Sequence, residues 1–586
     1  MCAVTPIFRG VISKIQGLRK VIDDFRTEAE SQFSMGKYSG TRRTAYISGI
    51  ALLCLLLYFI PLPWTSEITK GSSEDDDIWK TSIVQEFSSA DIPKRQAVVA
   101  AFQHAWSAYE RDAMGYDEYH PVRRKGTNFS KDGGVGYTII DAIDTMYLMG
   151  LKAEYSRARH WIKTKLSFSR GGNFNTFETT IRVLGGLLSA HYLTSDKLFL
   201  DRAIDLADRM LPAFNTPSGL PLPSVNLSAS TGLPDQWTPD RISTAEASTL
   251  QLEFRYLAEL SKNKDYWYKA EKVMEIIYKA RTEHNLVPIF MSAENGTFTP
   301  SDIRLGSRGD SYYEYLLKQH LQTNRTEPIY RKIYDDAMEG IHSKLVQKTP
   351  RRHLTYIAEL IPRSSFGDVS QAQWSLQHKQ DHLVCFLAGS LMLGAATSEE
   401  HDLSEPVQPS SFKPRAKRDW KTGVELLETC MRTHETMTGL SPEIAMFRNK
   451  MNETAERDWY IKNWQKGGPI TYDARYMLRP ETVESLFLAW RLTGNVRYRD
   501  YAWGIFTSIE KHCRLSGGGY ATVLDVDTVP VKRQDKQETF FLSETLKYLY
   551  LIFSDSGVLP LKDVVFNTEA HPLPVFTYSI IPAFSL

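Results

Sequence analysis

One structural unit returns along most of this chain. Each copy has an apolar helix, a short polar joint followed by an aromatic residue, and an amphipathic helix; the clearest copy spans residues 490–512. Helix pairs that recur every roughly 40–95 residues are typical of a solenoid or a closed ring. About seven pairs without a capping repeat favour closure, so we expect an all-α (α/α)7 barrel with minor β hairpins; an open solenoid is the alternative. One pair contains a polar insertion at 398–418, before a helix expected at 424–433, and the best strand signal lies at 517–523.

A second feature lies near the N-terminus. Residues 45–60 contain no charged side chain, and the apolar run continues to Trp64. About 20 such residues can cross a hydrocarbon core of ~30 Å as a helix. Arg42 and Arg43 precede the run and the acidic segment 74–77 follows it, so the positive-inside rule places the N-terminus in the cytosol. A cleaved signal peptide fits less well because 44 residues precede the span; a buried core helix is the other alternative.

We therefore expect one membrane-spanning helix and a lumenal body. The expected segments are a cytosolic tail at 1–44, a transmembrane signal-anchor at 45–64, a lumenal stem at 65–93 and the barrel at 94–580. Five glycosylation sequons follow the span, beginning at Asn128, Asn226, Asn295, Asn324 and Asn452. Three of the five cysteines also follow it, which allows one disulfide and one leftover thiol in an oxidising compartment. The net charge of +1, without a basic run interleaved with aromatics, argues against a nucleic-acid partner.

Acidic residues recur in the first turn of the more apolar helices, directly after a loop. These acids are Glu178, Asp310, Glu481, Glu484, Glu538 and Glu544, and Arg182, Arg308 and Arg479 accompany them. Each acid alone could cap its helix, because a carboxylate satisfies free N–H groups and favours the positive end of the dipole. If the inner helices of a ring run parallel, however, these helix starts meet at one mouth.

Two carboxylates in an aromatic-lined pocket suit glycoside hydrolysis, in which one protonates the leaving oxygen and the other activates water. A zinc site is disfavoured, because the histidines are scattered and the thiols are not clustered. Acids beside a hydroxyl suit a hard cation such as Ca²⁺. No serine nucleophile elbow or phosphate-binding glycine loop stands out. The residues alone thus predict a helical ring with an acidic mouth suited to sugars.

These motifs resemble those of the class I α-1,2-mannosidases, glycoside hydrolase family 47. The likeness runs from about Phe102 to Pro574 and is carried by residues 136–145, 306–315, 381–386, 438–443, 478–485 and 566–572, with the motif around Glu178. The resemblance implies an (α/α)7 barrel that removes terminal α-1,2-mannose from high-mannose N-glycans with inversion at the anomeric carbon. It also implies Ca²⁺ bound by the carbonyl and hydroxyl oxygens of Thr568, with water as most of the remaining ligands.

The resemblance assigns roles to individual residues. It makes Glu481 the general base, and either Glu178, through a water, or Asp310 the acid. Like charges crowd this mouth, so one carboxyl can stay protonated near neutral pH, as an acid must. Further pocket positions are Arg182, Arg308, His382, Glu443, Arg479, Glu484, Phe540, Glu544 and Glu569, with capping or core packing as the alternative for each. A disulfide between Cys385 and Cys430 is implied, worth roughly 4 kcal/mol in the chain-entropy model, with Cys513 left free.

Arg308 bears on the subtype. Endoplasmic-reticulum members of the family resemble this chain in having arginine two residues before the acid, whereas Golgi members usually have a smaller or apolar residue. A guanidinium fork can bind several sugar hydroxyls at once. We therefore expect nine-mannose to eight-mannose trimming of the middle branch by a monomeric lumenal domain in the endoplasmic reticulum. A Golgi-type enzyme that trims to the five-mannose glycan and a non-catalytic lectin of glycoprotein degradation are the alternatives. The chain departs from the family pattern at Ala388, usually proline, and adds residues 398–418 and 448–467.

Overall fold

The computed structural model describes residues 85–585, except 365–368, 370–371, 400, 402 and 453–454. The expected tail, signal-anchor and most of the stem lie outside these residues. Within them, no helix is long and apolar enough to cross a membrane.

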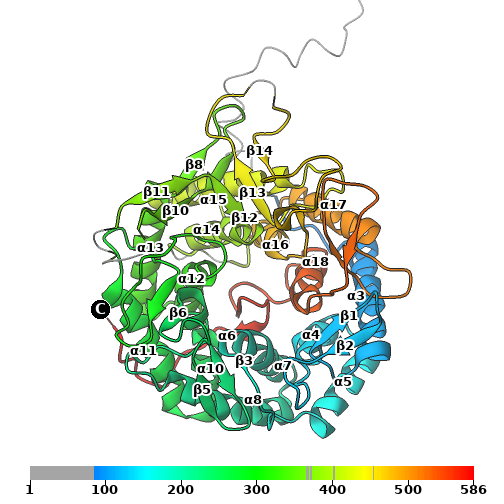
Figure 1. Ribbon diagram of the computed structural model, residues 1–586, viewed down its shortest axis with the longest axis vertical. Coiled ribbons are helices and arrows are strands. Elements are labelled where there is room, and N and C mark those ends of the chain that lie inside the picture. Colours follow the sequence, from blue (N-terminus) through cyan, green and yellow to red (C-terminus); the bar gives the residue numbers. More distant parts are fainter. Residues whose placement is uncertain are drawn as a thin grey trace, which may run out of the picture. The chain divides into compact units, whose positions relative to one another are not determined.

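An inner ring of helices forms the centre of the described body (Figure 1). Its seven members there are α4 (Tyr137–Leu148), α7 (Gly185–Thr194), α10 (Gln251–Ser261), α12 (Asp310–Gln322), α14 (Phe386–Ala396), α16 (Glu481–Thr493) and α18 (Leu546–Ile552). Two of them begin with a π-helical turn, η1 (Thr179–Leu184) before α7 and η7 (Phe541–Thr545) before α18. Each member contacts the next, and η7 completes the ring by packing on α4. Every residue of α14 and α16 is buried, which accounts for the apolar sequence of α14.

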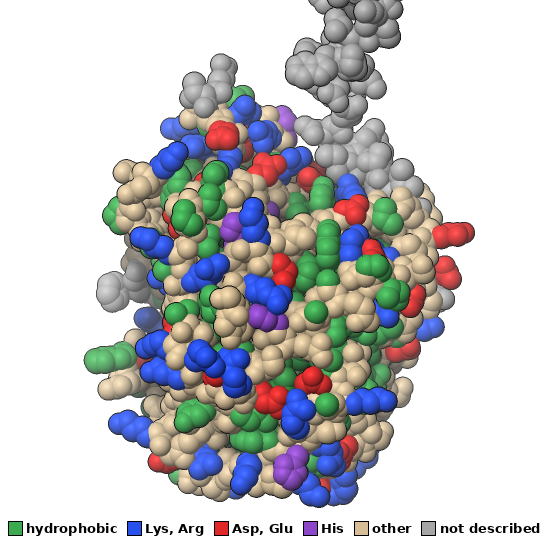
Figure 2. All heavy atoms as spheres, turned by 90° about the vertical axis from the view of Figure 1, so that its right-hand side faces the viewer, with side chains coloured by type: hydrophobic (Ala, Val, Ile, Leu, Met, Phe, Trp, Pro, Cys, Tyr) green, Lys and Arg blue, Asp and Glu red, His purple; other side chains and the backbone are tan. Residues whose placement is uncertain are grey.

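An outer helix packs on each inner one. The outer helices are α3 (Ile92–Ala113), α5 (Lys152–Thr164), α8 (Lys197–Met210), α11 (Lys264–Ala280), α13 (Pro328–Lys344), α15 (Pro414–Thr433) and α17 (Arg497–His512). They bury a single stripe; in α8 it is Phe199, Ala203, Leu206, Ala207 and Met210. Their solvent faces carry charges of both signs, as Figure 2 shows for one side. Because the first outer helix, α3, packs on the last inner helix, α18, the expected closed ring is confirmed and the open solenoid is excluded.

Short antiparallel strands connect the helices. The first nine are β1 (Glu118–His120), β2 (Lys125–Thr127), β3 (Phe174–Asn175), β4 (Ser224–Asn226), β5 (Thr231–Leu233), β6 (Arg241–Ser243), β7 (Phe290–Ser292), β8 (Val346–Lys348) and β9 (Thr355–Ile357). The others described are β10 (Glu359–Pro362), β11 (Trp374–Gln377), β12 (Lys379–Asp381), β13 (Ile444–Phe447), β14 (Trp459–Tyr460), β15 (Thr522–Val523), β16 (Arg533–Gln534), β17 (Val564–Phe566) and β18 (Pro572–Pro574). They form sheets of two or three strands, and the strand expected at 517–523 is reduced to β15.

The last hairpin, β17–β18, lies inside the ring. Strand β17 contacts α12 and β18 contacts α7, and Figure 1 shows the C-terminal segment, in red, surrounded by the inner helices. The turn at 567–571 reverses the chain with Ala570 in the left-handed region, at a φ of 57°. This turn brings Thr568 and Glu569 into the ring interior.

Two boundaries differ from those predicted, namely the start of α15 and the start of the folded body. Helix α15 begins at Pro414 rather than at Val424. Its first turns read as polar because Arg415 and Arg418 form ion pairs with acids of α13, Asp335 and Glu339. Residues 85–91, in the expected stem, are bound to the body: the Gln85 N–H donates to the Thr493 carbonyl at 2.9 Å.

The implied disulfide is confirmed. Cys385 and Cys430 are bonded, with their Cα atoms 6.0 Å apart. The bond joins the start of α14 to α15. Cys513 is free and buried, and burial raises the pKa of its thiol, so it packs as an apolar side chain.

Candidate active site

The predicted acids and arginines gather around one cavity of about 890 Å³, at the starts of the inner helices. Ten predicted residues line it, namely Glu178, Arg182, Arg308, Asp310, Arg479, Glu481, Phe540, Glu544, Thr568 and Glu569. Two guanidiniums, those of Arg182 and Arg479, each lie 5.6 Å from the centroid of the Phe540 ring. Parallel inner helices therefore bring distant helix starts to one mouth.

Three predicted residues lie behind this lining and contact residues in it or near it. Glu443 accepts two hydrogen bonds from Arg479, at 2.6 and 3.1 Å. His382 Nε2 lies 3.9 Å from Glu481 Oε2. Glu484 Oε1 lies 3.5 Å from Lys318 Nζ, deeper in the ring. The residues predicted from the resemblance thus include both side chains that line the cavity and side chains that contact the lining from behind.

Asp310 and Glu481 each occupy the first position of an inner helix, α12 and α16. Burial raises the pKa of Asp310 to about 7; the Ser311 amide opposes this shift, and Glu314 and Glu481 add to it. Burial also raises the pKa of Glu481 to about 7, against the nearby guanidinium of Arg479. Within the described residues, no lysine, arginine or histidine forms an ion pair with Asp310, whereas Arg479 Nη1 lies 3.9 Å from Glu481 Oε1. The surroundings therefore favour a proton on Asp310 over one on Glu481.

Glu178 is held differently. It ends the short helix α6 (Thr176–Glu178), where Asn175 Oδ1 accepts a hydrogen bond from its N–H at 2.7 Å. The π-helical turn η1 follows and directs Arg182 back to Glu178, with 2.6 Å between Nε and Oε2. Arg182 Nη1 also donates to Thr539 Oγ1 at 2.8 Å and to Glu569 Oε1 at 2.7 Å. Glu178 thus faces the cavity as the partner of a fixed cation.

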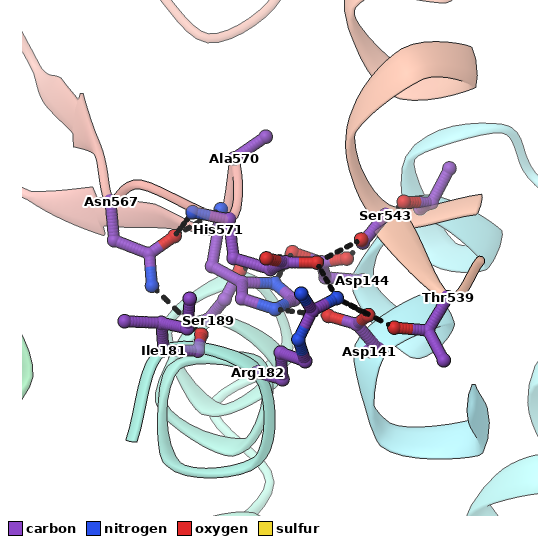
Figure 3. Close-up of polar contacts among 12 residues, drawn as sticks. Asp141, Asp144, Ile181, Arg182, Ser189, Thr539, Ser543, Asn567, Ala570 and His571 are labelled. Carbon is purple, nitrogen blue, oxygen red and sulfur yellow. Dashed lines mark hydrogen bonds and ion pairs between the residues drawn. The ribbon is translucent and has the colours of Figure 1, made fainter. Parts of the chain in front are cut away.

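A buried ionic network lies behind Arg182 (Figure 3). Asp141 Oδ2 is 3.6 Å from Arg182 Nη1, and its other oxygen is 3.1 Å from His571 Nε2. His571 Nδ1 contacts Asp144 Oδ2 at 2.8 Å, and Lys547 Nζ contacts the same oxygen at 2.8 Å. Burial alone would lower the pKa of His571, but Asp144 and Asp141 outweigh this effect and raise the pKa above its usual value. Such buried charges persist only when paired, and these pairs join α4, α18 and the 567–571 turn.

The cavity also contains an acid that sequence reasoning missed. Glu246 lies in α9 (Thr244–Ala247), and its N–H donates to the Ser243 side chain at 3.4 Å. Its Oε1 accepts from Arg308 Nη1 at 3.1 Å, and Arg308 has a left-handed backbone with φ of 74°. Burial raises the pKa of Glu246, and Arg308 opposes the shift. The Ser-x-x-Glu spacing before α10 is a capping box, so the pattern used for the other acids would have found it.

The floor of the cavity is rich in hard oxygen donors. Thr568 Oγ1 donates to Glu314 Oε2 at 2.8 Å. Burial raises the pKa values of Glu544 and Glu569 well above their usual range; Glu569 adds to the shift of Glu544, and Asp141 adds to that of Glu569 against the effect of Arg182. Within the described residues, no three His, Cys, Asp or Glu side chains are grouped as direct metal ligands. A hydroxyl and a carbonyl among carboxyls therefore fit a hard cation that keeps most of its water.

Comparisons with known proteins agree with this geometry. A family model described as glycosyl hydrolase family 47 matches residues 101–575. The chain is 41% identical over 493 residues to the mannosyl-oligosaccharide 1,2-alpha-mannosidase of Candida albicans, covering 82% of this chain and 83% of the relative. It is 43% identical to the endoplasmic reticulum mannosyl-oligosaccharide 1,2-alpha-mannosidase of Schizosaccharomyces pombe, covering 82% and 89%. The solved α-1,2-mannosidase from Trichoderma reesei superposes with a TM-score of 0.71 at 27% identity, covering 83% of this chain and all of that one.

Proposed function

The chain belongs to glycosyl hydrolase family 47, and we propose that it removes terminal α-1,2-linked mannose from high-mannose N-glycans. The observation that carries the proposal is the pair Asp310 and Glu481, two carboxyls at one cavity that each have a pKa of about 7. Because repulsion by Glu481 adds to the pKa of Asp310, one carboxyl can hold a proton while the other is ionised. An inverting hydrolase needs this state, with one carboxylic acid and one carboxylate.

The proposed reaction is a single displacement. Glu481 takes a proton from a water molecule, whose oxygen attacks the anomeric carbon as the glycosidic C–O bond breaks. Asp310 gives its proton to the leaving oxygen. Because the water attacks the face opposite the leaving group, the released mannose has the β configuration. We assign this proton to Asp310 because it has no cationic partner in the described structure. Glu178, which is paired with Arg182 and would act through a water, is the alternative.

We further propose that Ca²⁺ binds at the cavity floor. The hydroxyl and carbonyl oxygens of Thr568 would hold it, with water and the surrounding carboxyls completing the site. When bound, the cation would orient sugar hydroxyls and favour the ionised form of nearby carboxyls. The buried acid Glu544 supports this assignment, because it forms no ion pair within the described residues and positive charge would relieve its repulsion by Glu569.

For specificity, we propose nine-mannose to eight-mannose trimming of the middle branch. Arg308 and Glu246 form a fixed donor and acceptor pair at the cavity wall, suited to one arrangement of hydroxyls. The name of the Schizosaccharomyces relative supports residence in the endoplasmic reticulum. There the chain would be a single-pass type II membrane protein with a monomeric lumenal domain. The Golgi-type enzyme remains the catalytic alternative, and the complete set of acids argues against a non-catalytic lectin.

A time course with a labelled nine-mannose glycan, with and without chelator, tests these points together. We expect an eight-mannose product lacking the middle-branch mannose, loss of activity with chelator, and recovery with Ca²⁺. Proton NMR of fresh product should show the β-anomer of mannose. Rapid accumulation of the five-mannose product would favour a Golgi-type enzyme. Absence of turnover by the Ca²⁺-loaded protein would refute the proposal that the protein is an enzyme.

A further inference from the structure

A second cavity, of about 870 Å³, adjoins the catalytic one. The two share Glu178 and Arg182, which form the wall between them. Thr539 extends this wall on the side of the second cavity and accepts a hydrogen bond from Arg182 (Figure 3). The remaining side chains of the second cavity take no part in the proposed hydrolysis. Its position, one side chain away from the reacting sugar, suggests what it binds.

An exposed aromatic ring forms part of this second cavity. Phe129 is 47% exposed, which is unusual for a phenylalanine in a well-packed body. Its ring meets Tyr137 edge to face, with centroids 4.9 Å apart and an interplanar angle of 79°. Tyr137 is itself fixed, because its hydroxyl is 2.5 Å from Thr179 Oγ1 in η1. A ring that is held in place while partly open to solvent suits the apolar C–H face of a pyranose.

Polar groups of both kinds surround the ring. Lys536 Nζ lies 3.2 Å from both Glu118 Oε1 and Glu538 Oε2, so donors and acceptors alternate along this edge. The amide of Asn173 is exposed and makes no hydrogen bond within the described part of the chain. An amide offers both a donor and an acceptor to neighbouring hydroxyls.

The charges of the cavity exclude other ligand classes. Three carboxylates, those of Glu118, Glu178 and Glu538, face two cations, Arg182 and Lys536. The cations are already paired, so the cavity does not suit a phosphate or an acidic sugar. A balanced set of donors and acceptors beside an aromatic ring instead fits a neutral polyol.

We propose that the second cavity is a subsite for another hexose of the same branched glycan, away from the bond that is cleaved. This inference rests on the proposed function. A glycan whose terminal mannose enters the catalytic cavity would place a neighbouring sugar on Phe129 and Asn173. Binding energy gained there holds the oligosaccharide without contacting the reacting atoms.

The test compares a large and a small substrate. We measure kcat/KM for the nine-mannose glycan and for α-1,2-mannobiose, in wild type and in Phe129→Ala and Asn173→Ala. The ratio of the two values, glycan over disaccharide, should fall about tenfold in Phe129→Ala, as expected for loss of one buried stacking contact, and severalfold in Asn173→Ala. Tyr147→Ala removes an aromatic side chain of similar exposure, 45%, from the far end of α4, and should leave the ratio unchanged.

An unchanged ratio in both variants overturns the subsite. An equal loss on both substrates also overturns it, since that result would mean a disturbed Glu178–Arg182 wall. If Phe129→Ala does not fold, Asn173→Ala decides the matter, and Phe129→Trp should retain the wild-type ratio. If wild type cleaves neither substrate, the proposed function fails instead, so the two failures are distinguishable.

Discussion

Replacing Lys547 with methionine tests whether the buried network holds the floor of the barrel. Lys547 and Asp144 are both completely buried, 2.8 Å apart. Removing one partner of such a pair typically costs about 3–5 kcal/mol, because it leaves an uncompensated buried charge. His571 still contacts Asp144, so we expect a value near the lower end.

This free energy converts to a modest shift in melting temperature. The unfolding entropy is about 2.1 cal/mol/K per residue, or roughly 1 kcal/mol/K for a body of about 500 residues. Lys547→Met should therefore lower Tm by about 3–5 °C, measured by calorimetry at one pH and one scan rate. Lys547 Nζ also donates to the Ala570 carbonyl at 2.7 Å, so the Thr568 turn should loosen with it.

The matched control is Lys197→Met. Lys197 pairs with Asp201 one helical turn away, but their side chains are 79% and 54% exposed. Exposed pairs of this kind contribute about 0.3–0.5 kcal/mol, so Tm should change by less than about 1 °C. Equal shifts in the two variants, or a loss below about 1 °C for Lys547→Met, would refute the reasoning.

Four further outcomes are expected. Glu481→Gln should lower kcat by about 10²–10⁴-fold with little change in glycan binding, and near-normal turnover would exclude it as the base. Burial raises the pKa values of Asp310 and Glu481 to about 7, so their contribution to stability is present at low pH and lost as pH rises through 7. With chelator present, Tm should therefore be higher at pH 6 than at pH 8. The opposite order would contradict the burial argument. Arg308→Leu should extend trimming beyond the eight-mannose product, whereas an unchanged product profile would remove Arg308 from branch selection. Converting Cys385 and Cys430 together to alanine should lower the free energy of unfolding by roughly 4 kcal/mol, and a variant as stable as wild type would contradict the loop-entropy account.

The ring could be predicted because its two helix types differ in sequence. An inner helix such as α14 is buried on all sides and is apolar at nearly every position, while an outer helix such as α8 shows one buried stripe. Helix α15 was predicted to start too late because ion pairs to α13, rather than apolar residues, cover its first turns. The π-helical turns η1 and η7 also carry no sequence signal that periodicity reveals.

The sequence predicts which residues belong to the site, but not which of them line the cavity and which lie behind it. Acids at helix starts indicated that Asp310 and Glu481 share a mouth, yet nothing in their spacing separates cavity-lining residues from supports such as Glu443. The pairing of His571 with Asp141 spans 430 residues, and no local pattern predicts a contact at that separation. Glu246 is a different case, because its Ser-x-x-Glu spacing at 243–246 is a local pattern that the sequence shows.

The attachment of residues 85–91 has a consequence for access to large substrates. Gln85 is bound at the C-terminal end of α16, whereas Glu481 begins that helix at the mouth. Thirteen helical residues separate the two ends, a height of about 20 Å. Residues 85–91 therefore lie at the base of the barrel, one helix length from the entrance. A glycan carried on a bulky folded protein can approach the mouth without steric conflict with residues 85–91.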